Sequence, residues 1–164
     1  MKIAVYGSGA REHSLCWRLM QDSVQHEIFC IPGNSAIGKI AGRRPMRTFA
    51  EEAKWAREQK VDLVVIGPEQ PLADGIVDVF TEAGVPAFGP TRAAAKLEWS
   101  KSHAKTVMHS CSVPTAPWGV VDDALMARNL TTFLKGPPIV LKADGLAAGK
   151  GVSVCDTEAK LASA

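Results

Sequence analysis

The sequence predicts an α/β fold in which a parallel sheet is covered by helices on both faces. Short apolar segments alternate with amphipathic segments through about residue 100, as expected when strands are joined by helices. The clearest strand, residues 61–67, holds five apolar residues without alternation, which is typical of a strand buried on both faces. Strong hairpin signals are absent from this region, so we expect helical crossovers and parallel strands.

The individual elements follow from apolar spacing and from turn residues. Strands are predicted at residues 2–6, 26–31, 61–67 and 85–89. Helices are predicted at residues 11–22, 49–60 and 76–84, and a further one begins after Pro90 and Thr91. In the first helix the spacing of i, i+3, i+4 and i+7 predicts an inward face made of His13, Cys16, Trp17 and Met20. Gly84 is a stop signal for the third helix, and residues 67–75 are expected to form a loop.

Beyond residue 100 the pattern changes, and a second domain is expected there. A helix over 100–111 and a linker over 113–117 lead to a predicted strand at 118–121. A helix over 122–134 follows, with Asp122 as its expected N-cap. Two strands, at 138–143 and 151–155, then flank a glycine-rich loop. We therefore predict a first domain over 1–100, a helix and linker over 101–116, and an incomplete second domain over 117–164.

Composition excludes several classes of protein. The 164 residues are 46% hydrophobic and 22% charged, with a net charge of +2 and no basic stripe, so charge indicates neither nucleic acid nor membrane as a partner. The apolar run at the N-terminus is too short for a signal peptide. The four cysteines have no metal-binding spacing, and we expect reduced, mostly buried thiols in a cytoplasmic protein: Cys16, Cys30, Cys111 and Cys155.

The first glycine loop matches only half of a dinucleotide-binding fingerprint. Gly7 and Gly9 occupy its first two positions, but the third holds Glu12, and no carboxylate follows the second strand. Two glycines before a helix nevertheless favour a single phosphate on a small molecule. Arg11 and His13 would add donors from the first helical turn. The alternative is a tight turn in which Arg11 and Glu12 are merely solvated.

Similar loops follow the other predicted strands. Ligands of such sheets bind beyond the carboxyl ends of the strands, and these ends are rich in Gly, Pro and polar residues. The sequence therefore predicts an anion or sugar-phosphate site, because four such loops together exceed what turns alone require. The candidate residues are Gly7, Gly9, Arg11, Glu12, His13, Pro32, Gly33, Asn34, Pro68 and Glu69.

The second glycine loop, residues 144–151, is not a Walker loop. A glycine is missing at the required spacing, Gly151 follows the lysine where Ser or Thr is needed, and a strand rather than a helix comes next. We interpret it as a hairpin tip that closes over a nucleotide polyphosphate, with exposed backbone amides and cations. The alternative is a flexible surface hairpin with incidental lysines. The candidate ATP-binding residues are Lys105, Lys142, Asp144, Gly145, Gly149, Lys150 and Gly151.

These motifs, in this order, resemble the glycinamide ribonucleotide synthetase family. The matching segments are GSGAREH, PGN, GPEQPLADG, FGPT, the SKxxAK helix and LKADGLAAGKGV, which together span nearly the whole chain. The resemblance implies a Rossmann-like first domain that helps to bind the sugar phosphate, followed by the beginning of an ATP-grasp domain. It also implies an ATP-dependent ligase of purine biosynthesis that joins glycine to 5-phosphoribosylamine, with Mg or Mn accompanying ATP, and we favour a monomer.

The chain departs from the family in ways that limit these expectations. Family members commonly have Gly where this chain has Ala10 and Trp99. The family is much longer, so its metal ligands and most of its glycine site are expected beyond residue 164, and no metal ligand or catalytic residue is assigned here. We therefore expect an N-terminal fragment that is inactive by itself. Alternatives are a non-catalytic sugar-phosphate or nucleotide-binding module, another ATP-grasp ligase, and a nicotinamide-dependent oxidoreductase.

Overall fold

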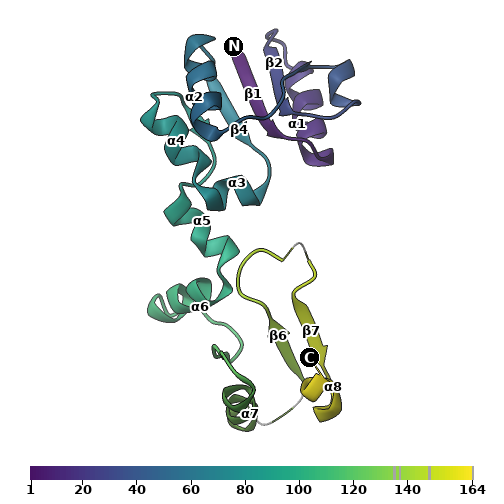
Figure 1. Ribbon diagram of the computed structural model, residues 1–164, viewed down its shortest axis with the longest axis vertical. Helices are drawn as coiled ribbons and strands as arrows, with labels where there is room; N and C mark the ends of the chain where they lie inside the picture. The colour runs from purple at the N-terminus through teal and green to yellow at the C-terminus, as the bar shows by residue number, and fades with distance from the viewer. Residues whose placement is uncertain (135, 137, 148, 164) are drawn as a thin grey trace. The chain divides into compact units, whose positions relative to one another are not determined.

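The computed structural model describes residues 1–134, 136, 138–147 and 149–163. The chain forms two compact units, Met1–Ala95 and Lys96–Ala164, and each is described by itself. Figure 1 shows the first unit as a sheet with helices beside it and the second as helices with a hairpin.

The first unit is built on a five-stranded sheet in which every pairing is parallel. The order is β3-β2-β1-β4-β5, so the first strand lies in the centre. The parallel sheet predicted from alternating apolar segments is confirmed. Its strands are β1 (Lys2–Gly7), β2 (Glu27–Pro32), β3 (Gly42–Arg43), β4 (Leu63–Ile66) and β5 (Ala87–Phe88).

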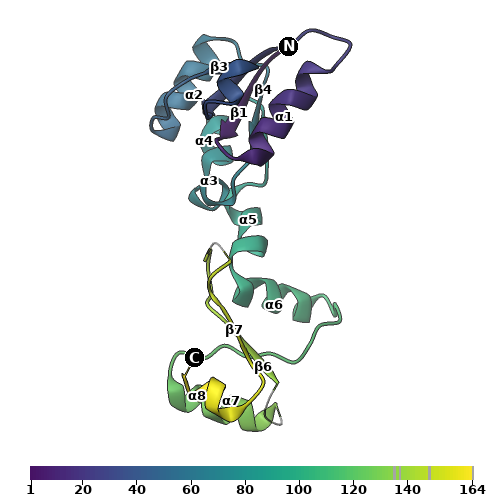
Figure 2. The ribbon, with the colours of Figure 1, turned by 90° about the vertical axis from the view of Figure 1, so that its right-hand side faces the viewer.

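Helices cover both faces of this sheet, as the sequence predicts (Figures 1 and 2). On one face, Cys16 packs in a buried cluster with Val5 and Cys30. On the other face, the ring of Tyr6 meets Phe49 edge-on with 6.1 Å between centroids. The helices are α1 (Ala10–Met20), the 3₁₀ turn η1 (Ile37–Lys39), α2 (Phe49–Glu58), α3 (Glu69–Asp74) and α4 (Ile76–Glu82), and α5 (Arg92–Trp99) continues into the second unit.

The predicted inward face of α1 is wrong by one position. Trp17 is 55% exposed and Met20 is 47% exposed. The buried positions are Glu12 and Cys16, and Leu15 and Leu19 pack against the core beside them. These four positions have the same i, i+3, i+4, i+7 spacing, but the first is a carboxylate, which a search for apolar residues does not count.

Three further elements of the first unit differ from the prediction. The segment that we expected to be entirely loop contains α3 (Glu69–Asp74), which ends at Gly75 in the left-handed conformation, with φ of 92°. The short strand β3 and the turn η1 were not predicted. Elements of two or three residues carry no periodic signal, so an apolar pattern cannot reveal them.

A buried carboxylate fixes the segment that leads into α2. Glu52 is fully buried, and it accepts hydrogen bonds from Arg44 Nε at 2.8 Å and from the Arg47 backbone N–H at 2.9 Å. The Arg44 guanidinium also lies 4.4 Å from the centroid of the Trp55 ring. A buried charge needs such partners, and here they tie the chain after β3 to the helix.

The second unit contains an antiparallel hairpin, in which Val140 pairs with Val154 and Lys142 with Val152. This confirms the two strands predicted around the second glycine loop. The unit consists of α6 (Lys101–Ser110), α7 (Ala124–Phe133), β6 (Ile139–Lys142), β7 (Val152–Cys155) and α8 (Glu158–Ser163).

Two predictions for this unit are wrong. Residues 118–121 form no strand, because no described segment pairs with them and a strand requires a neighbour for its backbone groups. The N-cap of α7 is Asp123 rather than Asp122. The Asp123 carboxylate accepts a hydrogen bond from the Met126 N–H at 2.7 Å.

The cysteines behave largely as predicted. All four are free; Cys16, Cys30 and Cys155 are buried and Cys111 is exposed. Among the described residues, no helix combines the length and apolar character needed to cross a membrane.

We predict that Glu52→Gln destabilises the protein by about 2–3 kcal/mol, because an amide has one oxygen for two donors and leaves one donor facing an NH₂ group. Urea unfolding of the variant measures the loss. Glu58→Gln is the matched control, because Glu58 lies on the same helix in an exposed pair with Lys54 and should cost less than about 0.5 kcal/mol. Equal losses in the two variants would contradict the anchoring role of Glu52.

Candidate functional site

The parallel sheet brings three of the predicted binding loops to one edge. The central strand β1 lies between β2 and β4, and all three run in the same direction. Gly33 N–H donates to Gly7 O at 3.0 Å, and Gly67 N–H donates to Tyr6 O at 3.0 Å. The loops that begin at Gly7, Pro32 and Gly67 are therefore neighbours.

Glu12 is a structural centre of this edge. It is only 4% exposed, and its Oε2 accepts a hydrogen bond from the Gly9 N–H at 2.5 Å. A Cβ on Gly7 would lie 2.6 Å from Glu12 Cδ, and a Cβ on Gly67 would lie 2.7 Å from the same atom. A side chain at either position would therefore force Glu12 to shift, and the Gly9 amide already has an anionic partner.

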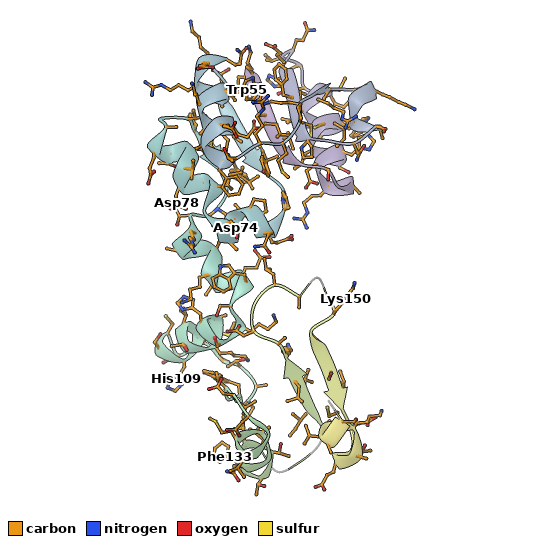
Figure 3. All side chains as sticks on the ribbon, in the orientation of Figure 1. Trp55, Asp74, Asp78, His109, Phe133 and Lys150 are labelled. Carbon is orange, nitrogen blue, oxygen red and sulfur yellow. The ribbon has the colours of Figure 1, made fainter. Side chains whose placement is uncertain are left out.

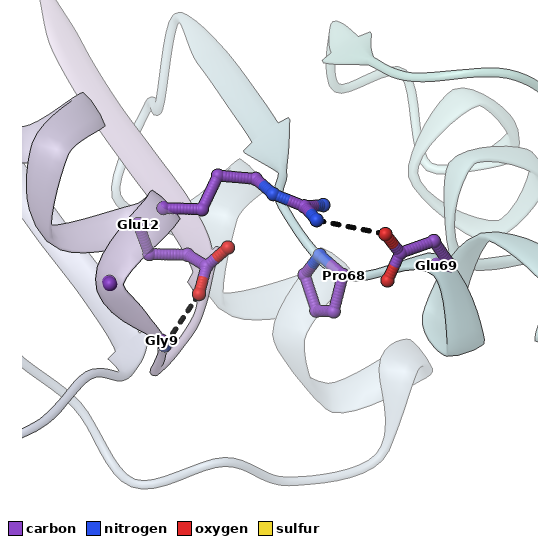
Figure 4. Close-up of a pocket in the computed structure, with 6 residues that line it drawn as sticks. Gly9, Glu12, Pro68 and Glu69 are labelled. Carbon is purple, nitrogen blue, oxygen red and sulfur yellow. Dashed lines mark hydrogen bonds and ion pairs between the residues drawn. The ribbon is translucent and has the colours of Figure 1, made fainter. Parts of the chain in front are cut away.

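A cleft of about 280 Å³ opens beside Glu12 (Figure 4). Arg11 reaches across it: its Nη1 donates to Gly67 O at 2.5 Å and its Nη2 donates to Glu69 Oε1 at 2.9 Å. The hydrogen bond from Arg11 lowers the pKa of Glu69 below its ordinary value, so this carboxylate is charged at neutral pH. The cleft is lined by Gly9, Ala10, Arg11, Glu12, Pro68 and Glu69.

Other predicted residues lie near this cleft without lining it. Asn34 joins two loops: its Nδ2 donates to Ser8 O at 2.8 Å, while its Oδ1 accepts from the Ala36 N–H at 2.9 Å. Pro32 and Gly33 belong to the same edge of the sheet but are not among the lining residues. The half-buried His13 does not line it either.

The predicted nucleotide lysines of the hairpin are exposed. Lys142 shares one face of the two strands with Val140, Val152 and Val154, because directly paired residues and alternate residues point to the same side. All four of these side chains are exposed. Lys150 lies on the connecting loop (Figure 3), and its backbone N–H donates to Ala147 O at 2.8 Å. Residue 148 of this loop lies outside the described residues.

Asp144, at the start of this loop, binds the first turn of α6. Its Oδ1 accepts from the Lys101 N–H at 2.6 Å and from the Ser102 N–H at 3.3 Å. Its Oδ2 accepts from Ser102 Oγ at 2.5 Å and from Ser100 Oγ at 3.2 Å. The Ser102 hydroxyl is the main reason that the pKa of Asp144 falls to about 2. The charged carboxylate therefore persists at neutral pH.

Two lysines of α6 lie one turn apart. Lys101 Nζ donates to Gly145 O at 2.7 Å, so it holds the backbone of the glycine loop. Lys105, predicted to contact a nucleotide, is four residues further along the same face, and its Nζ donates to Thr115 Oγ1. Lys105 and the residues that hold the base of the glycine loop therefore lie on the same helix, α6.

Sequence reasoning gave no role to Ser100, Lys101 or Ser102. They belong to the SKxxAK motif, but their hydrogen-bond partner, Asp144, is 42–44 residues away in the sequence. One signal was available: an Asp in a loop of small residues can accept hydrogen bonds from the free amides of a helix start. Trp99, just before them, has a buried indole N–H without a partner among the described residues.

Comparison with known proteins gives matches along the whole chain. The family model described as "Phosphoribosylglycinamide synthetase, N domain" matches residues 1–98, and the model described as its ATP-grasp (A) domain matches residues 99–164. A phosphoribosylamine–glycine ligase of Nostoc sp. is 42% identical over 161 residues, covering 96% of this chain and 38% of the relative. The trifunctional purine biosynthetic protein adenosine-3 of Gallus gallus is 44% identical, covering 96% of this chain and 16% of the relative.

Solved structures agree with these matches. A phosphoribosylamine–glycine ligase of Thermotoga maritima has a TM-score of 0.76 at 28% identity, covering 98% of this chain and 37% of that structure. The biotin carboxylase domain of a Hydrogenobacter thermophilus 2-oxoglutarate carboxylase, a complex with MgADP, has a TM-score of 0.77 at 22% identity, covering 99% and 39%. The second likeness shows a shared fold.

We predict that Gly67→Ala destabilises the protein by about 1–3 kcal/mol, because the new methyl group would displace the Glu12 side chain. On a Glu12→Ala background the obstacle is gone, so the same change should cost much less. Chemical denaturation of the wild type, both single variants and the double variant completes the cycle. Additive losses would contradict the contact between Glu12 and Gly67.

Proposed function

Because the chain belongs to the phosphoribosylglycinamide synthetase family, we propose that the whole protein is an ATP-dependent ligase that joins glycine to 5-phosphoribosylamine. The products are glycinamide ribonucleotide, ADP and phosphate. The chain spans about 38% of the length of the Nostoc relative, so the reaction is proposed for the whole protein. The observation that carries the proposal is the hairpin of β6 and β7, whose glycine loop bears Lys150 within the segment that matches the ATP-grasp domain.

The proposed chemistry overcomes the low reactivity of a carboxylate toward an amine. The γ-phosphoryl group of ATP is transferred to the glycine carboxylate, which gives glycyl phosphate and ADP. The amine of 5-phosphoribosylamine then attacks the carbonyl carbon. The C–N bond forms, the bond from carbon to the phosphate oxygen breaks, and the nitrogen releases a proton. Catalysis of such transfers depends on positioning and on neutralising charge.

The first unit would bind the sugar phosphate at the edge where its loops meet. Arg11 is the cation of the cleft, suited to the phosphate, and the Glu69 carboxylate can accept hydrogen bonds from ribose hydroxyls or from the amine. Asn34 and Gly33, with Pro32, would shape the adjoining loop, and His13 would complete the donors in the first turn of α1. Glu12 and the glycines around it hold these groups in place.

The second unit would bind ATP. Lys142 on its apolar strand face and Lys150 on the loop are exposed cations, and with Lys105 they fit a polyanion. Gly145 has φ of 92° and Gly149 has φ of 77°, a conformation that glycine readily adopts, and the Gly149 amide would be available to a phosphate. ATP is expected to arrive with Mg or Mn. The described residues hold no cluster of three or more metal-ligating side chains, so no metal ligand is assigned here.

The direct experiment is an assay of the whole protein with ATP, glycine and 5-phosphoribosylamine. We expect one glycinamide ribonucleotide and one phosphate for each ATP consumed. Parallel reactions with other carboxylate and amine pairs separate this activity from that of another ATP-grasp ligase. ATP binding without turnover of any pair would favour a non-catalytic nucleotide-binding module.

We further propose that the protein is cytoplasmic and acts as a monomer. Size-exclusion chromatography with light scattering checks the oligomeric state.

We predict that Lys142→Ala weakens ATP binding to the 164-residue chain by roughly 10- to 100-fold, since it removes one or two charge-assisted hydrogen bonds. Isothermal titration calorimetry measures the affinity. Lys160→Ala is the matched control: Lys160 is exposed in the same unit and pairs with Asp156, so its loss should leave the affinity unchanged. An unaltered affinity in Lys142→Ala would remove this residue from the proposed site.

A further inference from the structure

The two ends of the glycine loop are held very differently. At its incoming end, both carboxylate oxygens of Asp144 accept hydrogen bonds from the first turn of α6, and the Gly145 N–H also donates to Asp144 Oδ1 at 3.1 Å. Lys101 adds a bond from its side chain to the Gly145 carbonyl. We call this set, Asp144 with Ser100, Lys101, Ser102 and Gly145, the Asp144 clamp.

The outgoing end has a different set of contacts. Lys150 N–H bonds to Ala147 O within the loop itself, and Ala143 N–H bonds to Gly151 O where the strands begin at 2.8 Å. A Cβ on Gly149 would meet no atom within 4 Å, and the same is true of Gly145, whereas a Cβ on Gly151 would lie 2.7 Å from Ala147 Cβ. Among the described residues, neither of these two contacts ties residues 149–151 to a helix.

We propose that Asp144 is a positioning residue rather than a nucleotide ligand, and that the Asp144 clamp fixes the incoming end of the loop to α6. The nucleotide part of this inference rests on the proposed function; the clamp itself does not.

The chemistry of the carboxylate supports this role. An ionised carboxylate has about four lone-pair sites, and Asp144 already accepts five hydrogen bonds. Its partners include the amides at the start of α6, where the helix dipole favours an anion. A phosphate oxygen would be repelled by this carboxylate, whereas the bonds to Lys101 and Ser102 keep it facing the helix.

The clamp is present over a wide pH range. Its hydrogen bonds lower the pKa of Asp144 from the ordinary 3.8 to about 2, which means that folding favours the charged form. The stabilisation is therefore fully present above about pH 4 and is lost as the pH falls toward 2. The groups that favour the ionised state are the Ser102 hydroxyl and the backbone N–H groups of Lys101, Ser102 and Gly145, which all donate to the carboxylate.

Amide hydrogen exchange on the nucleotide-free 164-residue chain tests the clamp. In the wild type, the amides of Lys101, Ser102 and Gly145 should exchange more slowly than those of Gly149 and Gly151. In Asp144→Ala the first three should exchange roughly 10-fold faster or more, while the last two stay unchanged. Equal exchange at both ends in the wild type would overturn the proposal, and so would unchanged rates in the variant.

Three further variants keep the test independent of a folding defect. Ser102→Ala removes one hydroxyl donor and should also speed exchange at Gly145, whereas Ser102→Thr keeps that hydroxyl and should restore slow exchange. Asp156→Ala removes an exposed carboxylate that pairs with Lys160 and should leave the clamp amides unaffected. A response to Asp156→Ala as large as that to Asp144→Ala would show that any carboxylate has this effect, and would overturn the assignment.

A second arm with ATP separates the clamp from the proposed function. ATP added to the wild-type chain should slow exchange at Gly149 and Gly151, with little further change at Gly145. In Asp144→Ala the affinity for ATP should fall about 10-fold, because an unanchored loop loses more conformational freedom when it binds the nucleotide. A wild-type chain that binds no ATP would count against the proposed nucleotide site alone, because the exchange rates without ATP still decide the clamp. An ATP affinity unchanged in Asp144→Ala would overturn the positioning role.

Discussion

The first unit depends on one buried carboxylate. Glu12 lies between the loops that follow β1 and β4, and it accepts the Gly9 amide at the start of α1. Its side chain fills the space that a side chain at Gly7 or Gly67 would need. Two strand-end loops and the start of one helix therefore pack around a single residue, and the position of Arg11, the preceding residue of α1, follows from it. Without this arrangement the cleft would have no fixed wall.

In the second unit, too, a carboxylate binds the free amides at the start of a helix, but this carboxylate comes from a distant part of the chain. In α1 the carboxylate that binds the helix start comes from the helix itself, whereas in α6 it comes from Asp144, more than 40 residues away. Both helices begin with unpaired amides and a positive dipole end, which an anion stabilises. Glu12, which is close in sequence to the amide it binds, shapes the turn before α1. Asp144, which is distant in sequence, ties a loop of small residues to α6. Side chains as small as those of this loop could not do so through apolar packing.

Sequence patterns correctly predicted the parallel strands of the first unit and the loops that follow them. The run at 61–67 was enough to indicate a buried parallel strand, and parallel strands place Gly7, Pro32 and Gly67 at one edge. Patterns failed where a polar side chain replaces an apolar one, as at Glu12, because hydrophobic spacing cannot count a buried carboxylate. They also failed where a contact spans a long stretch of chain, as between Asp144 and Ser102. The strand predicted at 118–121 is absent from the structure. Its composition is typical of a strand, but no described segment pairs with it.

The charges of the two candidate sites indicate different ligands. The cleft of the first unit combines one guanidinium with the carboxylates of Glu12 and Glu69, so a simple polyanion would meet repulsion there. A molecule with one phosphate and several hydroxyl or amine donors satisfies both signs of charge. The hairpin of the second unit offers Lys142 and Lys150, and its one carboxylate is turned to α6. That arrangement suits a triphosphate. A ligase that consumes ATP and a sugar-phosphate amine needs these two kinds of site, so this charge distribution fits the reaction that we propose.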